Sequence, residues 1–229
     1  ARVYRPADGR AYRAVVLAHG VHYLGMDEPR LVPFARDLAR TGYVVLTPEL
    51  AALADYRVAH SSVDELRASV RWLRAQPYAR PGGVGLFGLS FAGGLSLVAA
   101  GAPDVRDDAA YVMSVGGHHD LERVSRFLAT DELVLPEGTR RMHAHDYGLI
   151  VFFYAHAERF VQGPQLPQLR DALRATLRAD HAAGRRVAEG LTGEARVLFD
   201  QLDRNDKPAL APLVLRAMPA LRGEMVSLS

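Results

Sequence analysis

The chain has 229 residues, of which 49% are hydrophobic, and this is enough to bury a substantial core within a single α/β fold. Its formal net charge is only +2, and its arginines alternate with acids along predicted helices, which argues against a nucleic-acid partner. It has no cysteine, which excludes disulfides and thiolate metal sites. No signal peptide is recognisable, and no apolar run approaches the roughly 18 residues that span a bilayer. We therefore expect a soluble protein without a membrane partner, and the cytoplasm is the favoured location.

Residues 1–120 alternate short apolar runs with segments of helical periodicity. An Asp8-Gly9 turn predicts a hairpin between the first two strands, and Ser62 with Glu65 fits the capping box of a helix. Strands that alternate with helices at these lengths predict a mainly parallel, doubly wound α/β sheet with helices on both faces. The predicted elements are strands over 2–4, 12–18, 43–46, 84–87 and 110–115, and helices over 31–41, 62–76 and 92–100.

From Leu121 onward the pattern changes to helical periodicity without a convincing strand. This stretch is too long for one crossover between strands, and it predicts a large helical cap insertion over the carboxyl edge of the sheet, where open α/β folds bind ligands. We therefore assign residues 1–120 to a core with a partial sheet and residues 121–229 to a cap or lid. The apolar segment 149–154 either lines an acyl pocket or packs the cap. Helices are predicted over 147–161, 168–183, 187–202 and 210–218.

A serine with small residues two positions before and after it joins the strand over 84–87 to the helix that follows. Gly88, Ser90 and Ala92 give the pattern G-x-S-x-A. A serine on a very tight strand-to-helix turn adopts strained backbone angles, and large side chains two positions away would collide with the chain. The pattern therefore predicts a nucleophile elbow with Ser90 as the catalytic residue. The alternative is a glycine-rich turn in which the serine only caps the helix.

An oxyanion hole is predicted from two backbone amides beside this serine. The buried strand over 14–18 ends in His19-Gly20-Val21, and the loop after this strand would supply the Val21 N–H. Phe91, which follows the serine, would supply the second N–H at the start of the helix. A histidine directly after a buried strand is typically structural, and we interpret His19 as a residue that bonds neighbouring loops.

The chain resembles the α/β-hydrolase superfamily through three segments that occur in the expected order. They are Val15 to Gly20, Gly42 to Pro48 and Gly85 to Gly94, and the spacing is similar to the dienelactone-hydrolase-like and bacterial esterase branches. The resemblance is specific over residues 13–117. It implies a serine hydrolase that cleaves a carboxylic ester or related acyl bond of a small molecule through an acyl-enzyme, without a cofactor.

The resemblance also implies an acid and a histidine on loops after later strands, and neither strand is present in the sequence. We therefore expect a C-terminally truncated fragment that lacks its base and acid and has little activity of its own. Two alternatives stay open. Asp120 lies where some relatives carry the acid, although it also suits a helix N-cap, and His143 or His145 would have to reach Ser90 from the cap.

The other candidate chemistries find little support in the residue spacing. The histidines and acids near His118 and His143 match no familiar metal-ligand spacing, so no metal site is predicted. The glycines from Gly82 to Gly85 enter a strand instead of leaving one, so no nucleotide cofactor is implied. A hydrolase-like binding or scaffold module without a complete triad is the alternative to an enzyme.

Overall fold

The computed structural model describes all of residues 1–229, and the chain divides into two compact units. The first unit comprises Ala1–His119 together with Leu228–Ser229, and the second comprises Asp120–Ser227. The predicted division after residue 120 and the observed division after His119 differ by one residue. The roles of core and cap that the sequence suggests for these parts stay predictions.

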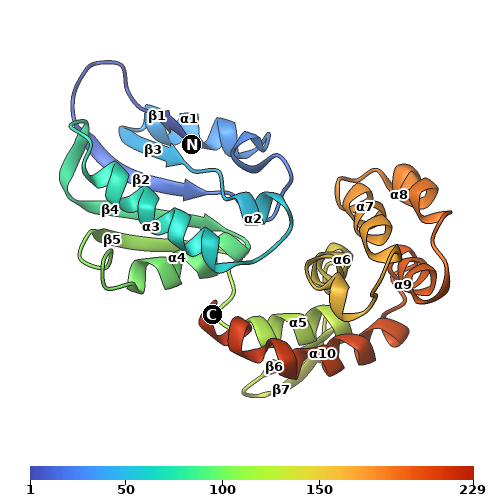
Figure 1. Ribbon diagram of the computed structural model, residues 1–229. Coiled ribbons are helices and arrows are strands. Elements are labelled where there is room, and N and C mark those ends of the chain that lie inside the picture. The colour runs from blue at the N-terminus through green and yellow to red at the C-terminus, as the bar shows by residue number, and fades with distance from the viewer. The chain divides into compact units, whose positions relative to one another are not determined.

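The first unit is an α/β structure with a mostly parallel central sheet, as predicted (Figure 1). The strand order is β1-β3-β2-β4-β5, and only β1 runs antiparallel to its neighbour. Strands β2 and β4 each have a neighbour on both sides, which explains the apolar runs over 14–18 and 84–87 within them. The five strands are β1 (Arg2–Tyr4), β2 (Tyr12–Ala18), β3 (Tyr43–Thr47), β4 (Ala79–Leu89) and β5 (Ala109–Val115).

The predicted hairpin between the first two strands is wrong. Strand β1 pairs with β3, in a register that sets Val3 opposite Leu46, and it does not pair with β2. Both edges of β2 pair with other strands, β3 and β4, so β1 adds to the outer edge of β3 instead. The Asp8-Gly9 turn is real, since Gly9 has a φ of 74° and the Tyr12 hydroxyl donates to the Asp8 carboxylate at 2.6 Å. The turn redirects the chain, and it does not set the strand pairing.

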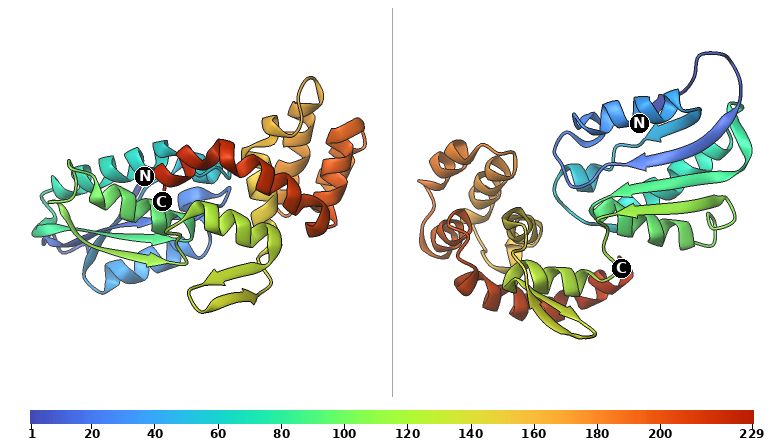
Figure 2. Two further views of the ribbon diagram at one scale, coloured as in Figure 1. Left: turned by 90° about the horizontal axis from the view of Figure 1, so that it is seen from below. Right: turned by 180° about the vertical axis from the view of Figure 1, so that it is seen from behind.

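Helices cover both faces of the sheet, as Figure 2 shows. On one face, Val15 and Leu17 of β2 form a core with Leu31 of α1 (Leu31–Arg40). The opposite face is covered by α3 (His60–Arg74) and α4 (Phe91–Gly101), which contact the central strands. Short helices η1 (Gly25–Asp27) and α2 (Ala51–Ala54) lie in the connections.

Strand β5 forms one edge of the sheet, and one of its faces is open to solvent. Tyr111, Met113 and Val115 alternate along the strand and are 43%, 48% and 48% exposed. They share the sheet face of Phe87 and Leu89, because Met113 and Val115 are the partners of these residues in the parallel register. The face that α1 covers over the first strands is therefore uncovered at β5.

The capping box predicted at Ser62 is also wrong. Helix α3 begins at His60, two residues earlier, and Ser62 lies in its first turn with a buried hydroxyl that has no hydrogen-bond partner. The Glu65 carboxylate accepts a hydrogen bond from the Ala51 backbone N–H at the start of α2 instead, and burial raises its pKa. The Glu65 carboxylate of α3 is therefore bonded to a backbone amide of α2, and the spacing of residues within α3 does not reveal this contact.

The second unit is mainly helical, with a small hairpin that the sequence pattern does not predict. Strands β6 (Glu132–Leu135) and β7 (Gly138–Arg141) pair antiparallel around Pro136-Glu137. Four-residue strands are too short to interrupt a helical pattern that is judged over longer windows. The helices are α5 (Leu121–Thr130), α6 (Asp146–Ala155), η2 (Ala157–Arg159), α7 (Gln165–Leu177), α8 (His181–Ala188), α9 (Gly193–Asp203) and α10 (Lys207–Ser227).

Helix α6 is the buried centre of the second unit. Leu149, Phe153 and Tyr154 are almost completely buried, and the Phe153 ring lies 4.6 Å from the ring of Phe160, centroid to centroid. Segment 149–154 therefore packs the interior, which agrees with the second of the two roles considered for it. No helix in the chain combines the length and apolar character that a membrane span requires.

The only lysine of the chain ties three segments of the second unit together. Lys207 at the start of α10 has a side chain that is only 12% exposed, and it donates to the Asp131 carboxylate and to the Ala144 carbonyl. Asp131 also accepts the Ala144 N–H at 2.7 Å. Burial alone would raise the Asp131 pKa, but these hydrogen bonds outweigh it and hold the pKa below its usual value.

We expect Lys207→Met to destabilise the second unit by about 1–3 kcal/mol, because it leaves the partly buried Asp131 carboxylate without its cation. Urea unfolding followed by far-ultraviolet circular dichroism measures this loss. Arg204→Met, at an exposed arginine whose side chain has no ion pair, is the matched control. Adding Asp131→Asn to Lys207→Met should recover part of the loss, since the unpaired charge is removed and asparagine tolerates the left-handed φ of 58° at this position.

Candidate functional site

Ser90 stands at a sharp turn between the end of β4 and the start of α4. Its backbone angles are φ 54° and ψ −133°, a left-handed conformation that costs a non-glycine residue about 1–3 kcal/mol. Its N–H donates to the Val115 carbonyl at 2.8 Å, which fixes the turn to the end of β5. The side chain is exposed and makes no capping hydrogen bond to the helix. The simple helix-cap interpretation of this serine is therefore excluded.

The small residues around Ser90 are required by space. A Cβ atom on Gly88 would lie 2.3 Å from the Ala92 carbonyl oxygen and 2.6 Å from the Gly93 Cα atom, and both are backbone atoms that cannot swing aside. A Cβ atom on Gly93 would lie 2.4 Å from the Ser114 hydroxyl of β5. Ala92 is completely buried. The pattern G-x-S-x-A thus reflects how closely the start of α4 approaches β4 and β5.

The loop after β2 lies directly beside this turn. Strands β2 and β4 are parallel with Ala18 opposite Gly88, so the next residues leave the sheet together. A Cβ atom on Gly20 would lie only 3.0 Å from the Ser90 Cβ atom. The segments that carry the two predicted oxyanion donors, Val21 and Phe91, therefore meet at one point. As the first residue of α4, Phe91 has no acceptor for its N–H within the helix.

His19 has a structural role, in agreement with the sequence interpretation. It is 1% exposed, and its Nε2 atom accepts the Leu50 N–H at 3.0 Å, which puts the ring proton on Nδ1. Nδ1 then donates to the Gly20 carbonyl at 2.7 Å. Both nitrogens are used, and burial lowers the pKa of the ring. His19 joins the loop after β2 to the start of α2, and it is not available as a catalytic base.

No histidine of the chain forms a hydrogen bond with the Ser90 hydroxyl. His118 is buried, its Nε2–H donates to the Leu228 carbonyl at 2.8 Å, and its ring centroid lies 5.5 Å from that of Phe91. His22 accepts the Leu24 N–H at 3.2 Å. The first unit thus holds the serine turn and its neighbouring amides without a base in contact.

The remaining candidate residues lie in the second unit, where Asp120 and His143 each have a local partner. Asp120 caps α5 by accepting the Arg123 N–H at 2.9 Å, which is the helix N-cap role considered for it. His143 lies 3.1 Å from the Asp146 carboxylate in the exposed turn before α6. Nowhere in the chain do three or more His, Asp or Glu side chains come together in a way that could hold a metal ion.

We expect Gly88→Ala to prevent folding of the first unit or to cost it several kcal/mol, because the added methyl group would overlap backbone atoms of α4. Gly101→Ala is the matched control at the other end of the same helix, since a Cβ atom there meets nothing within 4 Å. Soluble yield and the midpoint of thermal unfolding compare the two variants. Equal stability of the two variants would contradict the described turn.

The buried His19 makes stability depend on pH. Its pKa is lowered from 6.5 in the folded state, so the unfolded chain binds more protons below that pH. The stability that neutral His19 contributes is complete above about pH 6.5 and is lost as the pH falls toward the lowered folded value.

We expect His19→Asn to cost about 1–3 kcal/mol at pH 7.5 from the lost hydrogen bonds, and we expect this difference from the wild type to shrink by pH 5. Urea unfolding at both pH values measures it. His119→Asn, at an exposed histidine, should show no such dependence. A difference that grows on acidification would contradict the neutral, buried state of His19.

Comparison with known proteins shows only distant structural likeness. No protein-family model matches the chain, and no curated protein matches it. Among solved structures, the chain is similar to a hypothetical protein from Pseudomonas aeruginosa, with 19% sequence identity and a TM-score of 0.42. The similar region covers 59% of this chain and 43% of that protein, so the chain spans less than half the length of the structure it matches. A likeness at this level carries no argument about function.

Proposed function

We propose that the first unit is an α/β-hydrolase-like core in which Ser90 is the nucleophile of a serine hydrolase acting on carboxylic esters or related acyl bonds. The observation that carries the proposal is the strained backbone of Ser90, which has a positive φ between a central strand and a helix. The serine is exposed, and its side chain does not cap the helix. Such strain persists only where the surroundings enforce it, and it is concentrated at functional sites.

The chemistry proposed for Ser90 is acyl transfer. The hydroxyl oxygen attacks the carbonyl carbon of a small ester while a base takes the hydroxyl proton, and the carbonyl oxygen becomes an oxyanion. Collapse of this tetrahedral intermediate breaks the bond to the alkoxide, which receives the proton from the base and leaves as the alcohol, so that an acyl-enzyme remains. The backbone N–H groups of Val21 and Phe91 are proposed to bind the oxyanion, each contributing about 3 kcal/mol in favourable geometry. The close approach of Gly20 to Ser90 supports this arrangement, because it brings the loop that carries Val21 to the serine.

A serine nucleophile needs a base that takes its proton, and we propose no residue of this chain as that base. Its histidines are engaged elsewhere or are not bonded to Ser90, and a neutral hydroxyl is a weak nucleophile. We therefore expect residues 1–229 by themselves to have little esterase activity. A test of the proposed oxyanion hole must therefore use a nucleophile that reacts without a base.

A thiol in place of the serine is such a nucleophile, because it ionises near pH 8.5 without help. The chain has no cysteine, so Ser90→Cys introduces its only thiol. We expect the thiolate of this variant to be acylated by p-nitrophenyl acetate at least tenfold, and up to about a hundredfold, faster than an ordinary thiolate, because the Val21 and Phe91 amides stabilise the transition state.

The matched control is Ser61→Cys, at an exposed serine in the first turn of α3, so that both thiols lie at helix N-termini. The thiolate fraction of each variant is measured by ultraviolet absorbance, and acylation rates are compared per thiolate. Mass spectrometry assigns the acetyl group to position 90 or 61. Equal rates per thiolate would overturn the proposed oxyanion hole and the acyl chemistry with it.

The second candidate function is a hydrolase-like binding or scaffold module. The absence of any histidine bonded to Ser90 favours it, since such a module needs no base. Equal acylation of the two thiols in the comparison above would support this function. Faster acylation of the Ser90→Cys variant would speak for the hydrolase, because a scaffold has no reason to stabilise an oxyanion.

A further inference from the structure

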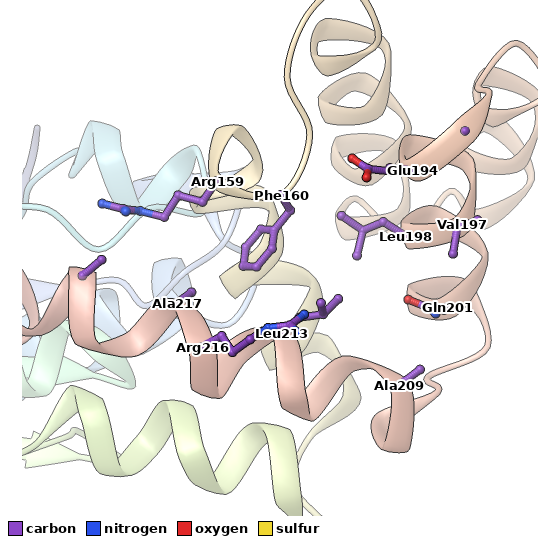
Figure 3. Close-up of a pocket in the computed structure, with 12 residues that line it drawn as sticks. Arg159, Phe160, Glu194, Val197, Leu198, Gln201, Ala209, Leu213, Arg216 and Ala217 are labelled. Atoms are coloured by element: carbon purple, nitrogen blue, oxygen red, sulfur yellow. The ribbon is translucent and has the colours of Figure 1, made fainter.

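A groove of about 860 Å³ lies between α9 and α10 in the second unit, with Phe160 and Leu213 among the side chains that line it (Figure 3). Nothing in the structure indicates what covers this groove, and we assign it no ligand. The first unit holds a different arrangement, in which the buried His19 is bonded to the loop that carries one of the proposed oxyanion donors.

The Gly20 carbonyl and the Val21 N–H belong to the same peptide group. A peptide group is planar, and in its trans form the carbonyl oxygen and the amide hydrogen point in opposite directions. This peptide group is trans, and the His19 Nδ1–H donates to its carbonyl oxygen at 2.7 Å. The hydrogen bond therefore fixes the Val21 N–H as well, and directs it away from the buried imidazole ring.

The ring of His19 is itself held from its other side. Its Nε2 atom accepts the Leu50 N–H at 3.0 Å, and the residue is almost completely buried. Only the neutral ring with its proton on Nδ1 makes both hydrogen bonds, because a protonated Nε2 would turn a second N–H toward the Leu50 N–H. The direction of the Val21 N–H thus depends on the charge of His19.

The surroundings of His19 keep the ring neutral at pH 7.5. Burial is the largest effect and lowers the pKa of the ring, although the hydrogen bond to Gly20 and the nearby Glu49 carboxylate raise it. His22, in the loop after β2, lowers the pKa further, and the carboxylate of Glu65 on α3 interacts with that of Glu49. The resulting pKa is below 6.5, so the ring gains a proton only as the pH falls through this lowered value.

We propose that His19 is a positioning residue whose neutral ring sets the direction of the Val21 N–H in the oxyanion hole, and that protonation of the ring releases this peptide group and weakens the oxyanion hole. This role rests on the function proposed for Ser90. A Cβ atom on Gly20 would lie 3.0 Å from the Ser90 Cβ atom, so a rotation of the Gly20–Val21 peptide group takes place directly beside the nucleophile. His19 acts through the backbone and does not contact the substrate.

The test compares the acetylation of the Ser90→Cys thiolate by p-nitrophenyl acetate with and without a change at His19. Glutamine at position 19 can still accept the Leu50 N–H through its side-chain carbonyl, but it has no donor at the place of Nδ1. We expect His19→Gln to slow acetylation per thiolate by roughly threefold to tenfold at pH 7.5, because one of the two oxyanion donors is misdirected.

Val70→Ala in the Ser90→Cys background is the matched control for a general loss of stability. Val70 is completely buried in the middle of α3, and its truncation leaves a cavity in the core of the same unit. We expect this variant to be destabilised and yet to keep the acetylation rate of Ser90→Cys. Thermal unfolding measures the stability of each variant.

The pH profile separates a positioning role from a contribution to stability. With His19 present, the rate per thiolate of Ser90→Cys relative to Ser61→Cys should be constant above about pH 6.5 and should fall as the pH decreases toward about 5. With His19→Gln, the same ratio should not change with pH. Circular dichroism at each pH confirms that the variants stay folded.

Two results would overturn the role of His19 alone. They are a folded His19→Gln variant that keeps the full acetylation rate, and a rate ratio that does not fall with pH although His19 is present. Equal rates for Ser90→Cys and Ser61→Cys at pH 7.5 with His19 intact would instead overturn the oxyanion hole itself, and the role of His19 with it. If His19→Gln does not fold, the pH profile of Ser90→Cys with His19 intact decides.

Discussion

The structure of the candidate site depends on one steric constraint, the close approach of α4 to the ends of β4 and β5. A helix can start this near to a strand only where the backbone carries almost no side chain, as at Gly88 and Gly93. A single residue between the strand and the helix must then change the direction of the chain, and Ser90 does so with a positive φ. The hydrogen bond from Ser90 to Val115 ties this reversal to the neighbouring strand. The unusual backbone at Ser90 is thus a consequence of sheet and helix packing.

The same constraint explains why the loop after β2 contributes to the site. Parallel strands end at the same edge of a sheet, so the residues after β2 and those after β4 emerge as neighbours. His19 holds this loop by its two hydrogen bonds, one to each side. A buried neutral histidine is suited to this task because it donates and accepts at once, which no lysine or arginine can do.

Much of this can be predicted from the sequence, and the failures have a common physical cause. The sequence places strands β2 to β5 and the turn at Ser90 within a few residues, because buried parallel strands and tight glycine turns leave strong local patterns. It does not reveal the pairing of β1 with β3 or the bond from Ala51 to Glu65, since both join residues distant in the chain. At the site, the sequence predicts the tight turn at Ser90 and a His19 that bonds neighbouring loops. It carries no information on a base, because a catalytic histidine is brought to its serine by the fold and not by sequence neighbourhood.

Val115 connects the edge strand β5 to the candidate nucleophile by a backbone hydrogen bond. Its side chain faces solvent on an outer strand, while its carbonyl oxygen is the acceptor for the Ser90 amide. Outer strands open more readily than central ones, because one row of their backbone groups is bonded only to water. When the end of β5 opens, the Ser90 N–H therefore loses its acceptor. The rate of hydrogen exchange at the Ser90 amide thus measures how often the turn between β4 and α4 opens together with the end of β5.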